Sequence, residues 1–247
     1  MLSLQKDSFM TDWKDRTRLL LKDEKLSVLE KAHVLVVGVG GVGAYAAEML
    51  CRAGVGKLTL VDGDKIEFTN RNRQLPALIS TEGKWKTEVL KNRFSDINPE
   101  LQIHVINEFL SDEKTAKVLD LEKYDYVIDA IDTISPKIFL IIETLKRKIP
   151  LVSAMGAGGK IDPSKVQVAD ISKTFYCPLA ACIRKQLRKH GVFNGFKAVF
   201  STEIRMENAS REDEKSQYKR TTVGTISYMP AVFGCWCAFV CINDLMI

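Results

Sequence analysis

A glycine-rich turn between two short apolar segments constrains the fold of this chain more than any other feature. Residues 33–37 are almost wholly apolar, four glycines follow within residues 38–43, and a second apolar segment at 57–61 ends at Asp62. Residues 44–53 have helical spacing and are followed by Gly54, a residue type that favours helix ends. The pattern predicts a strand, a tight turn, a helix and a second strand, which together form a nucleotide-binding βαβ unit.

The four glycines of this turn are Gly38, Gly40, Gly41 and Gly43. Because glycine has no Cβ, the backbone can turn sharply there and bring its N–H groups against a phosphate at the helix N-terminus. Asp62 is then placed to accept hydrogen bonds from the hydroxyls of a ribose. The turn therefore predicts a bound nucleotide, but it does not distinguish NAD from ATP.

The rest of the chain alternates predicted strands with predicted helices. The remaining segments expected to form strands are residues 101–106, 126–129, 150–154, 166–171 and 197–204. We therefore expect an α/β fold: a Rossmann-like, doubly wound, mostly parallel sheet extended by additional C-terminal strands and helices. Ligands of such sheets bind beyond the carboxyl ends of the strands, so Gly41, Asp62 and Asp132 should meet at one edge.

Length and composition predict one domain over residues 1–247, with a nucleotide-binding part at 1–155 and a substrate-binding part at 156–247. The charged, apolar-poor residues 207–220 are expected to form a mobile surface loop. Residues 1–13 contain no apolar segment, so we expect no secretory signal. We interpret the six cysteines as reduced thiols of a cytoplasmic protein.

The net charge of +5 arises from residues 151–247, because acidic and basic side chains cancel over residues 1–150. The basic side chains of interest lie in and after a helix predicted at 179–189, with no acidic residue among them. They are Arg184, Lys185, Arg188, Lys189 and Lys197. A basic surface beside a nucleotide site suggests a polyanionic second substrate such as RNA. On charge alone, a solvated basic helix face is an equal alternative.

The C-terminal residues 221–243 carry no charge and are numerous enough to span a bilayer. Pro230, Gly224 and Gly234 interrupt this segment and weaken the membrane interpretation. We expect a buried core or dimer helix here, and membrane association is the alternative.

Five motifs follow one another in the first 155 residues. They are Gly38-x-Gly40-Gly41-Val42-Gly43, Asp62-x-Asp64, Asn70-x-x-Arg73-Gln74, Gly83-x-x-Lys86 and Asp129-x-x-Asp132. In order and spacing they resemble the ubiquitin-activating-type (ThiF/MoeB-like) adenylating enzymes. NAD-linked enzymes share the glycine turn but not the Asn-Arg-Gln or Gly-x-x-Lys elements. Within the family, residues 156–163, 178–188 and 199–203 are most similar to the tRNA threonylcarbamoyladenosine dehydratases.

The resemblance implies roles for the matched residues. The glycine turn would contact the phosphates of ATP, Asp62 its ribose, and Asp64 would belong to the same nucleotide site. Asn70, Arg73 and Lys86 would hold and neutralise the triphosphate. Asp132 would hold Mg²⁺. Arg18 matches an arginine that the family contributes to the partner subunit's site, which implies a homodimer.

The activity implied by this resemblance is an ATP-dependent dehydration of threonylcarbamoyladenosine in tRNA, next to the anticodon. A substrate carboxylate would be adenylated with release of pyrophosphate, and attack from within the modification would close a ring and release AMP. The basic residues 184–197 would bind the tRNA phosphates. Proteins of a sulfur relay are possible further partners.

Three other functions remain as alternatives. The first is an adenylyltransferase that activates the C-terminal glycine of a sulfur-carrier protein. Those relatives bind zinc through two C-x-x-C pairs, whereas Cys177 and Cys182, and Cys235 and Cys237, have other spacings. We therefore expect no zinc. The second is an NAD-dependent oxidoreductase, and the third is a non-catalytic module that binds tRNA or sulfur-relay proteins.

Overall fold

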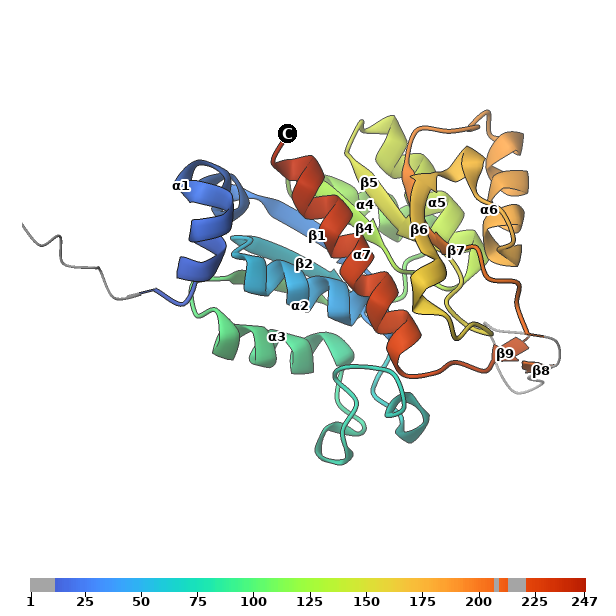
Figure 1. The fold of residues 1–247 in the computed structure, drawn as a ribbon, viewed down its shortest axis with the longest axis horizontal. Helices are drawn as coiled ribbons and strands as arrows, with labels where there is room; N and C mark the ends of the chain where they lie inside the picture. Colours follow the sequence, from blue (N-terminus) through green and yellow to red (C-terminus); the bar gives the residue numbers. More distant parts are fainter. Residues whose placement is uncertain (1–11, 207–208, 213–220) are drawn as a thin grey trace, which may run out of the picture.

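The computed structural model describes residues 12–206, 209–212 and 221–247 of the chain. A seven-stranded sheet in the order β3-β2-β1-β4-β5-β7-β6 forms its centre (Figure 1). Every neighbouring pair is parallel except β6 and β7, so the prediction of a doubly wound, mostly parallel sheet is confirmed. The strands are β1 (His33–Val37), β2 (Lys57–Val61), β3 (Gln102–Ile106), β4 (Tyr126–Asp129), β5 (Leu151–Ala154), β6 (Val166–Asp170) and β7 (Lys197–Ser201).

Helices cover both faces of the sheet. Side chains of α2, α3 and α7 pack on one face, and side chains of α4, α5 and α6 pack on the other. The helices are α1 (Asp15–Lys31), α2 (Gly43–Ala53), α3 (Lys86–Ile97), α4 (Asp112–Leu121), α5 (Ile134–Lys146), α6 (Pro178–Lys189) and α7 (Tyr228–Leu245). Short 3₁₀ helices lie at Phe68–Asn70, Ile79–Thr81, Pro163–Lys165 and Ile171–Lys173.

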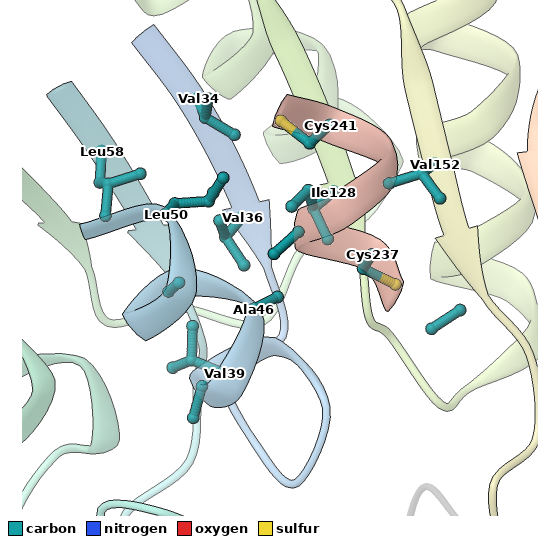
Figure 2. Close-up of a cluster of buried hydrophobic side chains, with 14 of the residues drawn as sticks. Val34, Val36, Val39, Ala46, Leu50, Leu58, Ile128, Val152, Cys237 and Cys241 are labelled. Atoms are coloured by element: carbon teal, nitrogen blue, oxygen red, sulfur yellow. The ribbon is translucent and has the colours of Figure 1, made fainter. Parts of the chain in front are cut away.

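Strand β1 is buried on both faces, as expected for a central parallel strand. Its side chains alternate, so that Val34 and Val36 enter one hydrophobic cluster while Leu35 and Val37 enter the other. Figure 2 shows the first cluster, where α2 and α7 lie side by side over this strand. The glycine turn that follows β1 is therefore attached to a strand that is buried within the hydrophobic core.

Helix α7 forms most of the uncharged C-terminal segment and packs against α2 and the sheet. The contact with α2 is close, because a Cβ at Gly234 would lie 2.5 Å from the carbonyl oxygen of Val42. Among the described helices, only α7 is long and apolar enough to cross a membrane, and 44% of that segment is buried inside the protein. One side of α7 is thus part of the hydrophobic core.

Two of the expected segments differ from the structure by more than one residue. The strand predicted at 197–204 ends at Ser201, because the Glu203 carboxylate turns inward and accepts the backbone N–H groups of Ile161 and Asp162. The mobile loop predicted at 207–220 contains a short strand, β8 (Ser210–Glu212), which pairs with β9 (Thr221–Val223). Residues 207–208 and 213–220 lie outside the described residues.

Candidate nucleotide-binding site

The glycine turn after β1 has room only for glycine at two positions. Gly38 has a φ of +83°, and a Cβ there would lie 2.8 Å from the carbonyl oxygen of Ala130. A Cβ at Gly43 would lie 1.8 Å from the carbonyl oxygen of Gly38. The turn is therefore closed on itself and pressed against the loop after β4. The N–H groups of Gly38 and Val39 donate to the carbonyl oxygen of Val61 and to Asp62, so the N–H groups at the start of α2 are the ones that can face a ligand.

Asp62, at the end of β2, ties this turn to the neighbouring strand. Its Oδ2 accepts the backbone N–H of Val39 at 2.8 Å, and its Oδ1 accepts that of Asp64, also at 2.8 Å. A carboxylate can accept about four hydrogen bonds, so both oxygens keep acceptor capacity for ribose hydroxyls. Burial raises the pKa of the Asp62 carboxyl, and the positive charge of Lys86 opposes this shift.

Lys86 begins α3 and brings a buried cation to the same place. Its Nζ lies 2.6 Å from Oδ2 of Asp64 and 3.9 Å from Oδ1 of Asp62, and only 4% of its side chain is exposed. A lysine in this position is held by carboxylates while its remaining N–H groups can meet an anion. The structure therefore brings together Asp62, Asp64 and Lys86 as the sequence predicted.

The polar loop between β2 and α3 covers the glycine turn. Asn70 is buried, and its Oδ1 accepts the backbone N–H of Glu67 at 3.1 Å. Nη1 of Arg73 donates to the carbonyl oxygen of Thr69 at 3.0 Å and to Oδ1 of Asn72 at 2.8 Å. The carbonyl oxygen of Arg73 is 3.6 Å from the Cβ position of Gly41, so this loop lies directly on the turn.

Gln74 belongs to the same loop, and sequence reasoning did not include it among the site residues. Its Oε1 is buried without a hydrogen-bond partner, and its Nε2 lies 3.6 Å from the Cβ position of Gly40. A buried acceptor with no partner costs about 1–3 kcal/mol, and a ligand that donates to it would recover this energy. Its position in the Asn70-x-x-Arg73-Gln74 motif was the available signal.

A second residue missed from the sequence is Lys137. Its Nζ lies 2.8 Å from Oδ2 of Asp129, and both side chains are fully buried. The pair is completed by Oγ of Ser153, which donates to Oδ2 of Asp129 at 2.6 Å. The position of this lysine among the apolar residues of the first half of α5 was the signal that could have identified it.

This buried pair fixes the loop that carries Asp132. The backbone N–H of Ile131 donates to Oδ1 of Asp129 at 3.1 Å, and Nζ of Lys137 donates to the carbonyl oxygen of Ile131 at 2.9 Å. Asp132 follows directly and is exposed. Because Ala130 lies against Gly38, this loop and the glycine turn meet at the carboxyl edge of the sheet, as predicted.

Arg18 lies apart from this site. Helix α1 connects to the amino end of β1, whereas the glycine turn follows the carboxyl end of β1 (Figure 1). Arg18 donates to Asp12 at 2.8 Å, to Asp23 at 2.9 Å and to Asp15. Within one chain, therefore, Arg18 does not reach the glycine turn.

The predicted basic residues are not all on one surface. Arg184, Lys185, Arg188 and Lys189 lie along α6, whereas Lys197 begins β7 at the amino edge of the sheet and pairs with Asp244. A sequence run of basic residues could not show that the chain reverses direction between α6 and β7. Among the described residues, no group of three or more His, Cys, Asp or Glu side chains could hold a metal ion.

Comparison with known proteins gives consistent matches over nearly the whole chain. The ThiF family matches residues 15–245. The tRNA threonylcarbamoyladenosine dehydratase of Bacillus subtilis is 43% identical over 227 residues, which cover 89% of each chain. The crystal structure of the E. coli tRNA N6-threonylcarbamoyladenosine dehydratase in complex with ATP has a TM-score of 0.86 and 38% identity, covering 95% of each chain. The structure of the same enzyme in complex with AMP also has a TM-score of 0.86.

Proposed function

The chain belongs to the ThiF family, and from this premise we propose that it is an ATP-dependent tRNA threonylcarbamoyladenosine dehydratase. The observation that carries the proposal is the site at the carboxyl edge, where the glycine turn, Asp62 and Lys86 meet the loop of Asp132. The resemblance extends over both halves of the chain, including the part beyond the nucleotide site.

ATP fits the charges and the acceptors at this edge. Asp62 would accept the ribose hydroxyls, and the N–H groups of the glycine turn would face the phosphates. Lys86, Arg73 and Asn70 would neutralise and position the triphosphate. Mg²⁺ in proteins is commonly held by one or two carboxylates together with substrate phosphates, so the single carboxylate of Asp132 fits this ion. The ion would supply charge neutralisation on the phosphates.

The chemistry requires charge stabilisation more than proton transfer. The threonyl carboxylate of the substrate is ionised at neutral pH, so it can attack the α-phosphorus without a general base. Negative charge grows on the phosphates as pyrophosphate leaves, and Lys86 and Arg73 would stabilise it. The adenylated carboxyl group is then attacked from within the modification, which closes a ring and releases AMP.

A homodimer would complete the site. Arg18 lies near the amino edge of the sheet, whereas the nucleotide site of the same chain lies at the carboxyl edge. Arg18 would therefore reach the phosphates only in the nucleotide site of a second copy. Exposed apolar side chains lie on the same helix, where Leu19 is 65% and Leu20 is 80% exposed, and on α7, where Phe239 is 52% exposed. Such side chains are typical of an interface, and we assign them to the dimer rather than to a membrane.

The tRNA would bind along α6 through Arg184, Lys185, Arg188 and Lys189. A tRNA substrate implies that the enzyme works in the cytoplasm. Lys197 is excluded from this surface, since it pairs with Asp244 of α7, which packs on the opposite face of the sheet from α6.

The direct test is incubation with ATP, Mg²⁺ and tRNA that carries threonylcarbamoyladenosine, followed by mass analysis of the nucleosides. We expect the modified nucleoside to lose one water, with AMP and pyrophosphate formed in equal amounts. Unmodified tRNA is the control and should give neither product. An unchanged nucleoside, with pyrophosphate exchange stimulated instead by a sulfur-carrier protein, would contradict the proposal and support the adenylyltransferase.

A further inference from the structure

A groove of about 360 Å³ opens beside the N-terminus of α6, outside the nucleotide site. Its walls combine apolar side chains with two arginines. The residues that line it are Tyr176, Cys177, Pro178, Ala181, Arg184, Ile204 and Arg205. None of them belongs to the glycine turn, to β2 or to the loop of Asp132, so the adenylation chemistry does not account for this groove.

The two arginines give the groove a positive charge that no carboxylate among the described residues pairs with. Within the part of the chain that the structure describes, neither Arg184 nor Arg205 forms an ion pair with a carboxylate, and Arg184 donates only to Oγ1 of Thr174. Nη2 of Arg205 is buried without a partner. The side chain of Arg205 crosses Gly159, where a Cβ would lie 2.7 Å from its Cγ. A guanidinium that packs on a backbone turn and has no carboxylate partner among the described residues favours an anionic ligand such as a phosphate.

The aromatic wall is held in an unusual conformation. Tyr176 has a φ of +53°, in the left-handed region that large side chains rarely adopt, and it is 62% exposed. Its ring packs edge-on against Phe175, whose ring packs edge-on against Phe200 in β7. Strained residues of this kind persist where the surrounding structure fixes them, and they cluster at ligand sites.

The groove lies on the same edge of the sheet as the nucleotide site. Sγ of Cys177 is 3.8 Å from the Cβ position of Gly156, which follows the carboxyl end of β5. Strand β5 pairs with β4, which ends at Asp129, so the groove and the Asp132 loop follow neighbouring strands. A substrate held in the groove could therefore extend to the adenylation site.

We propose that this groove binds an unpaired nucleotide of the anticodon loop next to the modified adenosine, with its base stacked on Tyr176 and its phosphate on Arg184 and Arg205. An exposed aromatic ring beside arginines is the usual means of holding a single-stranded base, because every base has a face that can stack. The inference rests on the proposed function, since it takes tRNA as the substrate. It adds Tyr176 and Arg205 to the basic residues of α6 as groups that hold the RNA.

The test uses a synthetic anticodon stem-loop that carries threonylcarbamoyladenosine, with binding measured by fluorescence anisotropy. Tyr176→Ala should weaken binding by about tenfold, whereas Tyr176→Phe, which keeps the ring, should bind within about twofold of the wild type. Phe193→Ala is the matched control, because Phe193 is equally exposed, at 61%, in the loop before the start of β7. ATP binding should be unchanged in every variant.

The charge of the groove is tested separately. Arg205→Gln should weaken binding and make the slope of log affinity against log salt shallower by about one. Lys117→Gln, which removes one exposed cation from α4, should change neither quantity. If Tyr176→Ala and Arg205→Gln bind the stem-loop as tightly as the wild type does, the groove is not the nucleotide-binding site. If the wild type binds the stem-loop through these residues but never dehydrates it, the groove stands and the proposed activity fails.

Discussion

Lys137 and Asp129 form an ion pair in which both side chains are fully buried. If either side chain is removed, the other remains as an unpaired buried charge, which carries a large desolvation cost. Their hydrogen bonds to Ile131 join this pair to the loop that carries Asp132. Lys137 is thus a positioning residue, which acts on the nucleotide site through the backbone of a loop that it holds from below.

Lys137→Met should lower the free energy of unfolding by about 3–5 kcal/mol, because it leaves the Asp129 carboxylate buried without its cation. ATP affinity should also fall in the folded fraction, since the loop loses the hydrogen bond from Nζ of Lys137 to the carbonyl oxygen of Ile131. Urea denaturation and ATP titration measure the two effects. Lys146→Met on the same helix is the control, because its side chain is 66% exposed and its ion pair with Glu143 should contribute less than about 1 kcal/mol. Equal losses in the two variants would show that the buried pair has no special role.

The sequence predicted the site residues that belong to local patterns and missed those defined by tertiary contacts. Gly38 and Asp62 lie in one strand–turn–helix–strand unit, so spacing alone places them together. Lys137 interacts with a side chain of another element, and no periodicity in α5 indicates which buried partner would accept its charge. Gln74 is recognisable only when the burial of its amide is known.

At the scale of elements, His33 connects the start of β1 to β2 and to the residue segment before β4 through hydrogen bonds. Nε2 of this histidine lies 2.9 Å from Oγ1 of Thr59 in β2, and Nδ1 lies 3.1 Å from the carbonyl oxygen of Lys123 before β4. Because a carbonyl oxygen only accepts, Nδ1 carries the proton and Nε2 of the neutral ring accepts from the Thr59 hydroxyl. Burial, followed by the charge of Lys57, lowers the pKa of the His33 imidazole.

A lowered pKa means that the unfolded chain binds this proton more readily than the folded chain does. Between the lowered folded value and the unfolded value near 6.5, unfolding takes up a proton, so stability falls as the pH falls. We expect the free energy of unfolding to rise by up to about 1.4 kcal/mol per pH unit across this window and to level off above it. His33→Gln should remove this part of the slope. His190→Gln, at an exposed site, should retain it, and an unchanged slope in His33→Gln would refute the assignment.

The elements themselves were well predicted, because buried parallel strands and the helices between them have distinct sequence patterns. All seven strands of the sheet lie where apolar segments predicted them. The errors fall where side chains determine the end of an element. Glu203 ends β7 by accepting backbone N–H groups from another segment, and this contact leaves no periodic trace in the sequence.

At the scale of the whole molecule, the proposed site requires two copies of the chain. The described part of a single chain brings Asp62, Lys86 and the Asp132 loop to one edge and leaves Arg18 at the other. Lys197 shows a related principle, because it is close in sequence to α6 but pairs with Asp244 of α7, which packs on the opposite face of the sheet. Sequence spacing does not reveal which edge a residue occupies until the strand directions are known.

Mixing two inactive variants tests the shared site. Arg18→Ala and Lys86→Ala should each be inactive alone. A random mixture should recover about a quarter of wild-type activity, because half of the dimers would be mixed and each would contain one intact site. Mixing two Lys86→Ala preparations is the control and should recover nothing. If native mass spectrometry shows mixed dimers but the mixture gains no activity, Arg18 does not belong to the partner's site.

We propose that the nucleotide site transfers AMP from ATP to a carboxylate, and isotope tracing follows this transfer atom by atom. The reaction is run with ATP and tRNA whose threonylcarbamoyladenosine carries ¹⁸O in both carboxylate oxygens. Attack of that carboxylate on the α-phosphorus, followed by ring closure, predicts that each AMP released carries one ¹⁸O atom and that the cyclic product keeps the other. Unlabelled AMP, or ADP formed together with labelled phosphate, would contradict the account.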